Sequence, residues 1–189
     1  MYFFLEITTA LAVLTVASQV FIVLAGISRL PWFNKKNGGT AWVQKYYNWL
    51  GFIISLVAVS SSLYFSDIVG LEPCKLCWFQ RILIYPQLIL FGVSLVLKKG
   101  KEILPYSITM AGIGWLIAAY HYTIQMSETA RSIGESIIPC STVGMTPSCS
   151  SYWFLKFGYI TIPMMSLTTL SLLIVLALLQ KADRPSLNS

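Results

Sequence analysis

The sequence is poor in charged residues, in cysteine and in histidine. Only 11% of its 189 residues are charged, whereas 56% are hydrophobic, and the mean hydropathy is +0.71. So low a charge density excludes an intrinsically disordered chain, because such chains are polar and highly charged. Four cysteines in 189 residues are too few for a small fold held together by disulfides. The composition instead indicates a membrane protein without room for a separate soluble domain.

Five long stretches contain almost no charged residue, and each is a candidate transmembrane helix, since a bilayer core needs about 20 apolar residues per span. The stretches are residues 2–28, 46–66, 82–97, 103–125 and 157–179. The third reaches full length when it is extended back to Trp78, which places Arg81 one turn inside its first end. An arginine at that depth is unusual. The sequence therefore predicts an all-α membrane protein with five spans.

The distribution of Lys and Arg predicts the orientation of the chain. The basic residues of one side are Arg29, Lys35, Lys36, Lys45, Lys98, Lys99, Lys101, Lys181 and Arg184. The other side holds Lys75, Arg81, Arg131 and Lys156, together with most of the acids. Because positively charged loops stay in the cytoplasm, we expect the amino terminus outside and the tail, residues 181–189, inside. The net charge of +6 then reflects topology and needs no nucleic-acid partner.

All four cysteines fall in the two predicted outer loops, and none falls in a span. Cys74 and Cys77 lie in the loop of residues 67–77, whereas Cys140 and Cys149 lie in the second outer loop. The extracytoplasmic side is oxidising, so disulfides form and persist there. Two pairs of thiols on that side indicate thiol–disulfide exchange.

Two structural roles for the cysteines compete with this interpretation. The cysteines could form disulfides that only staple the loops, or a four-cysteine zinc site, for which C-x2-C is a good half-site. A Cys74–Cys77 disulfide would close a very short loop, which gains little entropy and strains the bond, and strained disulfides are the reactive ones. Zinc would need four thiolates in an oxidising compartment. Redox chemistry is therefore preferred, and no metal is expected.

The surroundings of Cys77 favour its thiolate form. Pro73 marks the start of the third helix near Cys74, so Cys77 falls in the first turn, where the helix dipole favours an anion. Arg81 follows four residues later, on the same helix face. Both features are typical of a reactive cysteine. The alternative for Arg81 is a side chain that only reaches the lipid headgroups.

A reactive dithiol needs an electron acceptor, yet the sequence has a single histidine, no set of haem ligands and no flavin-binding glycine loop. A lipid-soluble quinone is therefore the expected acceptor. Pro86 is expected to kink the third helix below Arg81 and to open a shallow cavity for the quinone ring. His121 could donate a hydrogen bond to a quinone oxygen, or it could be an interfacial residue in an aromatic belt with Tyr120 and Tyr122.

The segment CKLCWFQRILIYP, residues 74–86, resembles the signature of the DsbB family of disulfide bond formation proteins, most of all its BdbC branch. The similarity covers about residues 46–180, including Tyr120-His121, Pro139-Cys140 and Thr161-Ile-Pro163. It implies a four-helix transmembrane bundle in the bacterial cytoplasmic membrane. Such a protein reoxidises a thioredoxin-fold oxidase of the DsbA or BdbD type and passes the electrons to ubiquinone or menaquinone.

The same resemblance implies a role for each cysteine. Cys140 forms the mixed disulfide with the partner oxidase, and Cys149 is its loop mate. Cys74 exchanges with this pair, whereas Cys77 faces the quinone with Arg81 beside it. The flow is downhill if the acceptor is more positive than about −120 mV, the potential of a DsbA-like partner, and a respiring quinone pool satisfies this condition.

Residues 1–30 depart from the four-helix pattern. The apolar stretch within it, residues 2–28, has no Lys or Arg before it and exceeds the apolar core of a signal peptide, about 7–15 residues, so we expect a retained fifth helix. Its role is open between an insertion signal, a partner contact and a lipid seal. A second departure is the short interval from Cys140 to Cys149, which is expected to require a shift of the whole loop during exchange.

Other protein classes fit the sequence less well. A vitamin K epoxide reductase-like protein also couples thiols to quinone, but its loop cysteines precede the C-x2-C motif. A non-enzymatic scaffold with loop-stapling disulfides would keep its cysteines oxidised in every condition. A transporter needs buried charges, and the spans carry only Arg81 and Glu6. The expected catalytic residues are Cys74, Cys77, Cys140 and Cys149, and the expected quinone contacts are Cys77, Arg81 and His121.

Overall fold

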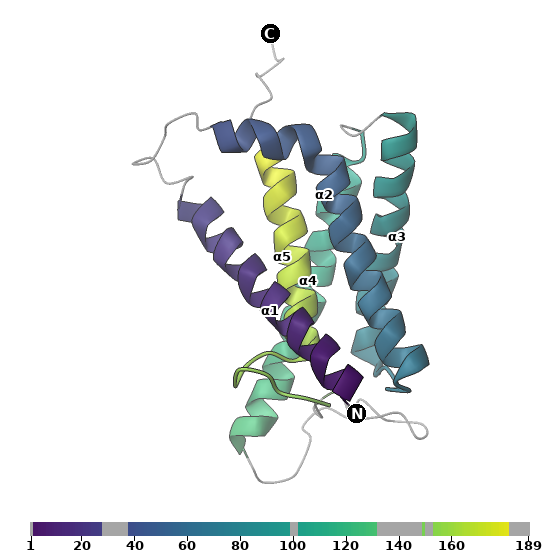
Figure 1. Ribbon diagram of the computed structural model, residues 1–189, viewed down its shortest axis with the longest axis vertical. Helices are drawn as coiled ribbons and strands as arrows, with labels where there is room; N and C mark the ends of the chain where they lie inside the picture. The colour runs from purple at the N-terminus through teal and green to yellow at the C-terminus, as the bar shows by residue number, and fades with distance from the viewer. Residues whose placement is uncertain (1, 28–37, 99–101, 132–148, 150–152, 182–189) are drawn as a thin grey trace.

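The computed structural model describes residues 2–27, 38–98, 102–131, 149 and 153–181, which form a helical bundle (Figure 1). In chain order its elements are α1 (Tyr2–Ile27), α2 (Gly38–Leu63), the π-helical turn η2 (Tyr64–Ile68), α3 (Lys75–Leu97), α4 (Leu104–Arg131) and α5 (Ile162–Lys181). Within the described ranges, the extended structure amounts to one bridge between Lys156 and Ile160. The predicted all-α fold is confirmed.

Four of the helical segments are long and apolar enough to cross a membrane. They are Phe4–Ile27, Lys45–Ile68, Lys75–Leu97 and Ile162–Gln180. The second begins inside α2, at Lys45, and Figure 1 shows the first turns of that helix crossing the end of the bundle before the helix turns along it. α4 is not among these long, apolar helices, so the fifth span stays a prediction. The orientation of the chain in the membrane also stays a prediction.

Some helix ends differ from the sequence-based boundaries. α2 begins earlier, at Gly38, and α4 continues to Arg131, whereas α3 begins at Lys75, next to the predicted start near Cys74. α5 begins later than residue 157 because Phe157 and Gly158 have positive φ angles of 51° and 78°. These two residues form a tight turn closed by hydrogen bonds between the backbones of Lys156 and Ile160, at 3.0 and 2.9 Å. An apolar run does not reveal such a turn, since its residues look like the start of the helix.

α4 packs against α3 and α5 through small side chains. Ala111 and Ala118 are fully buried, and a Cβ atom on Gly114 would lie 3.2 Å from Leu170 of α5. Small side chains let membrane helices approach closely. This close packing brings the end of α4 that carries His121 against the start of α3.

α1 leans across α5 (Figure 1) and is held there by polar contacts as well as by packing. Gln19 Nε2 donates to Thr168 Oγ1 at 3.1 Å, and the Tyr159 hydroxyl donates to Gln19 Oε1 at 2.9 Å. Three turns earlier on α1, Lys156 Nζ donates to Thr9 Oγ1 at 3.1 Å. Hydrogen bonds between helices define a register in a lipid environment. α1 is therefore docked at a fixed position on the last helix.

Candidate functional site

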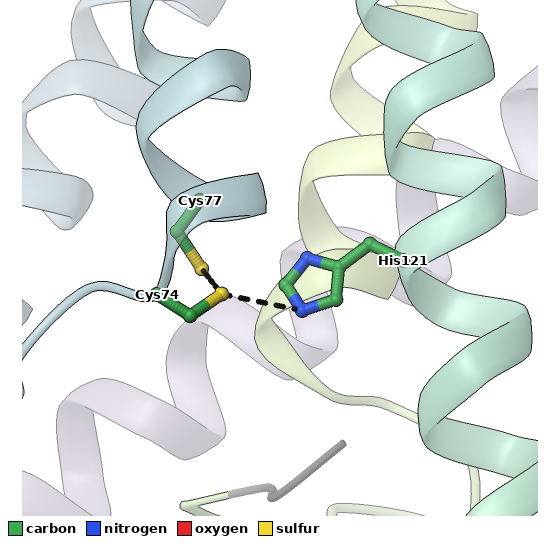
Figure 2. A group of neighbouring side chains, drawn as sticks. All are labelled: Cys74, Cys77 and His121. Atoms are coloured by element: carbon green, nitrogen blue, oxygen red, sulfur yellow. Dashed lines mark hydrogen bonds between the residues drawn. The ribbon is translucent and has the colours of Figure 1, made fainter. Parts of the chain in front are cut away.

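The first two cysteines lie at the start of α3. Cys74 is the N-cap residue with an extended backbone, and Cys77 is the third residue of the helix. Both are free thiols, and Cys74 Sγ donates a hydrogen bond to Cys77 Sγ across 3.3 Å (Figure 2). The prediction that Cys77 lies in the first turn of this helix is confirmed.

Cys74 is the member of the pair that holds its proton most firmly. The hydrogen bond that it donates to Cys77, together with its burial, raises the pKa of Cys74 from 9.0 to about 12, although its contact with His121 acts in the opposite direction. Only 6% of Cys74 is exposed. In the reduced pair, Cys77 Sγ therefore accepts the hydrogen bond and Cys74 Sγ donates it.

His121 of α4 joins this pair to the last cysteine. Its Nε2 atom lies 3.6 Å from Cys74 Sγ (Figure 2) and 3.2 Å from the backbone carbonyl oxygen of Cys149. Its Nδ1 atom lies 3.0 Å from Gln80 Nε2. An amide nitrogen can only donate and a carbonyl oxygen can only accept, so the neutral ring carries its proton on Nε2. That proton points toward Cys149 and Cys74.

The burial of His121 excludes one of its two sequence-based interpretations. The side chain is 1% exposed and both ring nitrogens contact protein atoms, so it does not face lipid in an aromatic belt. Cys149 is also buried, at 1% exposure. Cys140, the remaining predicted catalytic cysteine, lies outside the described residues.

Gln80 is a site residue that the sequence-based reasoning missed. It is 5% exposed and bonds to His121. The feature that could have revealed Gln80 is the spacing of the buried residues of α3, which alternates between four and three positions. These residues are Gln80, Ile84, Gln87, Phe91 and Ser94. A glutamine in such an apolar row needs a partner because an unpaired buried amide is costly.

Arg81 contacts the end of α2 rather than extending freely to headgroups. Its Nη2 atom donates to the Ser62 carbonyl oxygen at 3.2 Å, and its guanidinium lies 5.4 Å from the centre of the Trp78 ring. One turn further along α3, the Tyr85 hydroxyl donates to Ser62 Oγ at 3.3 Å. A guanidinium has five N–H donors, so these contacts leave donors for a ligand.

A cavity of about 340 Å³ connects these side chains, and its size is within the usual range of small-molecule sites. Its polar lining includes Cys74, Cys77, Gln80, Arg81 and His121. Most other lining side chains are apolar, and they continue along α2 to Ile53 and along α5 to Leu172. Pro86, which the sequence predicted would open this cavity, lies within α3 but does not line it.

The same side chains have the composition of a partial metal site. The ligand atoms of Cys74, Cys77 and His121 all lie within 4.8 Å of one another. Two thiolates and an imidazole are three of the four ligands of a tetrahedral zinc centre. The described geometry thus leaves the zinc alternative open, while the adjoining apolar cavity is a feature that a closed structural zinc site does not need.

Comparison with known proteins identifies one family. Residues 44–180 match the family described as disulfide bond formation protein DsbB. The chain is 38% identical over 124 residues to probable disulfide formation protein C 1 of Bacillus anthracis, covering 66% of this chain and 84% of that protein. It is 35% identical over 139 residues to disulfide bond formation protein C of Bacillus subtilis, covering 74% and 93%. No solved structure matches significantly. α1 lies outside the family match.

Proposed function

The chain belongs to the DsbB family of disulfide bond formation proteins, and from this premise we propose that it is a membrane thiol:quinone oxidoreductase. It reoxidises an extracytoplasmic thioredoxin-fold oxidase of the DsbA or BdbD type. It passes the electrons to ubiquinone or menaquinone in the bacterial cytoplasmic membrane. Residues 46–180 form the catalytic bundle, with both cysteine loops on the extracytoplasmic side.

The observation that carries the proposal is a dithiol beside a largely apolar cavity. Cys74 and Cys77 both line this cavity, whose apolar walls suit a lipid-soluble acceptor ring. Arg81 lines it too and supplies a permanent positive charge, which stabilises the negative charge that develops on a quinone oxygen during reduction. A structural disulfide or a structural zinc site requires no such cavity.

Each step of the proposed path moves two electrons, and the first two steps are thiol–disulfide exchanges. The dithiol of the partner attacks the Cys140–Cys149 disulfide, so the partner becomes oxidised and the two loop thiols are released. The loop thiols then reduce a Cys74–Cys77 disulfide by attack at Cys74. The Cys74–Cys77 dithiol finally returns to the disulfide while two electrons and two protons pass to the quinone, giving the quinol.

Three residues are assigned separate roles in the reduction of the quinone. Cys77 is the thiol that faces the acceptor, because it accepts the hydrogen bond of the pair while Cys74 retains its proton. We assign Arg81 and His121 as the contacts of the quinone oxygens, and the Nε2 proton of His121 reaches such an oxygen in place of the Cys149 carbonyl oxygen. The Nε2 proton of His121 lies within reach of Cys74 Sγ, so the same ring can also stabilise a Cys74 thiolate when it leaves a disulfide.

The test is an anaerobic assay with purified full-length protein, a reduced thioredoxin-fold oxidase as donor and a soluble quinone as acceptor. The wild type and a Thr109→Ser control, altered on the exposed face of α4, are expected to reduce the quinone, which is followed as a fall in quinone absorbance. Cys77→Ser is expected to leave this absorbance unchanged. Quinone loss at the wild-type rate with Cys77→Ser would contradict the proposal. No loss with the wild type, with all cysteines remaining disulfide-bonded, would favour the scaffold.

A further inference from the structure

α1, the helix outside the family match, forms one wall of the cavity. Its lining residues are Leu11, Leu14, Thr15 and Ser18, which repeat at spacings of three, one and three and so share a face. The facing wall is α2, and α5 lies behind both (Figure 1). The bundle of the family match alone would therefore leave this side of the cavity open to lipid.

α1 packs closely against α5. Thr8 and Ala12 are fully buried, Thr15 is 7% exposed, and Gln19 follows one turn later on the same stripe. Such small residues let helices approach closely, and the hydrogen bond from Gln19 to Thr168 fixes the register. A helix that served only as an insertion signal would not need this fit.

The wall that α1 contributes is suited to hydrocarbon. Thr15 Oγ1 donates to the Leu11 carbonyl and Ser18 Oγ donates to the Leu14 carbonyl, both at 2.8 Å. The hydroxyl protons of these two lining residues are thus used within α1 itself, and the other two lining side chains are leucines. The cavity donors able to bind a ring oxygen come from the other helices, among them Arg81 of α3 and Ser166 of α5, whose side-chain oxygen has no hydrogen-bond partner. The cavity is therefore polar at the cysteine pair and apolar along α1.

We propose that α1 binds the polyprenyl tail of the quinone while α3 and α4 bind its ring. The assignment rests on the proposed function, since it completes the binding site of the same acceptor. On α2 the lining residues run from Ser62 to Ile53, about two and a half turns, and on α1 they run from Leu11 to Ser18, about two turns. A tail leaving a ring at Cys77 follows this groove and reaches lipid between α1 and α2. α1 thereby favours tailed over tailless quinones.

Adjacent α1 residues allow a matched test. Leu14 lines the cavity and Val13 does not, although each is 54% exposed. Wild type, Leu14→Trp and Val13→Trp are reconstituted in phospholipid vesicles with reduced donor. Two acceptors are compared, a long-tailed ubiquinone and the same ring bearing only a methyl group in place of the tail.

Leu14→Trp is expected to raise the apparent KM for the tailed quinone at least about fivefold, because the indole fills the space of the tail. The KM for the tailless quinone stays unchanged, and Val13→Trp changes neither value. Equal changes for both quinones with Leu14→Trp, or no change for either, would overturn the assignment. If the wild type reduces neither quinone, the proposed function fails and this assignment fails with it.

A binding readout that does not depend on turnover, or on the folding of Leu14→Trp, uses the wild type alone. A quinone carrying a photoreactive group on its tail is added to the vesicles, irradiated, and located by mass spectrometry. Labelling is expected on the peptide containing residues 11–18. Labelling that spares this peptide and falls only on α2 or α5 would place the tail elsewhere and overturn the proposal.

Discussion

Cys74 and Cys77 are chemically unequal although they lie within one helical turn. Cys74 donates to Cys77, touches His121 and is buried, whereas Cys77 accepts. The sequence was sufficient to single out this pair and Arg81, because C-x2-C and a basic residue four positions later are local patterns. It was insufficient for Gln80, whose role depends on a contact with another helix that no local pattern encodes.

The raised pKa of Cys74 predicts how its alkylation depends on pH. Only a thiolate reacts, so a pKa of about 12 keeps Cys74 slow at pH 8, with a rate that rises as pH increases toward that value. The hydrogen bond to Cys77 is the largest cause, so Cys77→Ala should lower the pKa and speed alkylation of Cys74 at pH 8. Mass spectrometry of the reduced protein measures both rates, with Thr109→Ala as control. Equal rates in wild type and Cys77→Ala would contradict this account.

The proton position on His121 is directly measurable because the chain has a single histidine. In ¹⁵N-histidine-labelled protein, the nitrogen spectrum is expected to show a protonated Nε2 and an unprotonated Nδ1. Gln80→Glu replaces the amide donor with an acceptor, so a proton should appear on Nδ1.

Gln87→Glu is the matched control, since Gln87 is also a buried glutamine of α3 but contacts Ser107 instead of the histidine. It should leave the histidine spectrum as in the wild type. A wild-type ring protonated on Nδ1 and bare on Nε2 would show that Gln80 does not set the tautomer.

Arg81→Ala should impair quinone use without preventing disulfide formation. Loss of the guanidinium removes charge stabilisation and hydrogen-bond donors from the cavity, so the apparent quinone KM should rise about tenfold, equivalent to about 1.4 kcal/mol. Gel-shift alkylation should still find both disulfides formed after mild oxidation. Arg81→Lys retains the charge but not the planar guanidinium, so its apparent quinone KM should lie between those of the wild type and Arg81→Ala. An unchanged KM in Arg81→Ala would exclude contact between Arg81 and the quinone.

At the scale of the elements, charge-free runs predicted the helices well and their packing only in part. Four of the predicted spans are helices long and apolar enough to cross a membrane, as expected because long apolar stretches have few alternatives in a bilayer. The start of α5 was misplaced because the turn at Phe157 depends on backbone angles within an apolar run. The seat of α1 on α5 was not predicted, since it depends on distant partners such as Gln19 and Thr168.

The fit between α4 and α5 makes two neighbouring glycines unequal. A Cβ on Gly114 would meet Leu170 at 3.2 Å, whereas a Cβ on Gly112 would meet nothing within 4 Å. Gly114→Ile should therefore destabilise the bundle by about 1–3 kcal/mol through overpacking. The matched Gly112→Ile should leave stability nearly unchanged. The unfolding midpoints of the two variants are measured by heating in detergent, with size-exclusion chromatography as the readout. Equal midpoints would contradict the close packing of these helices.

At the scale of the whole molecule, the fold brings parts distant in sequence to one end of the bundle. The start of α3, His121 near the end of α4 and Cys149 meet there, next to a cavity walled by all five helices. The Cys74–Cys77 dithiol therefore has two neighbours. One is the segment that carries Cys149, and the other is the apolar cavity. The proposed electron path uses both, with Cys140 as the entry point for electrons from the partner.

The most direct measurement is the stoichiometry of an anaerobic reaction in which reduced partner oxidase is the electron donor and quinone is the only added oxidant. The account predicts one quinol formed per partner disulfide with the wild type. With Cys140→Ser it predicts neither product, while quinone binding is retained. Partner oxidation without an equivalent amount of quinol, or full turnover by Cys140→Ser, would contradict the proposed path from the partner through the cysteine pairs to the quinone.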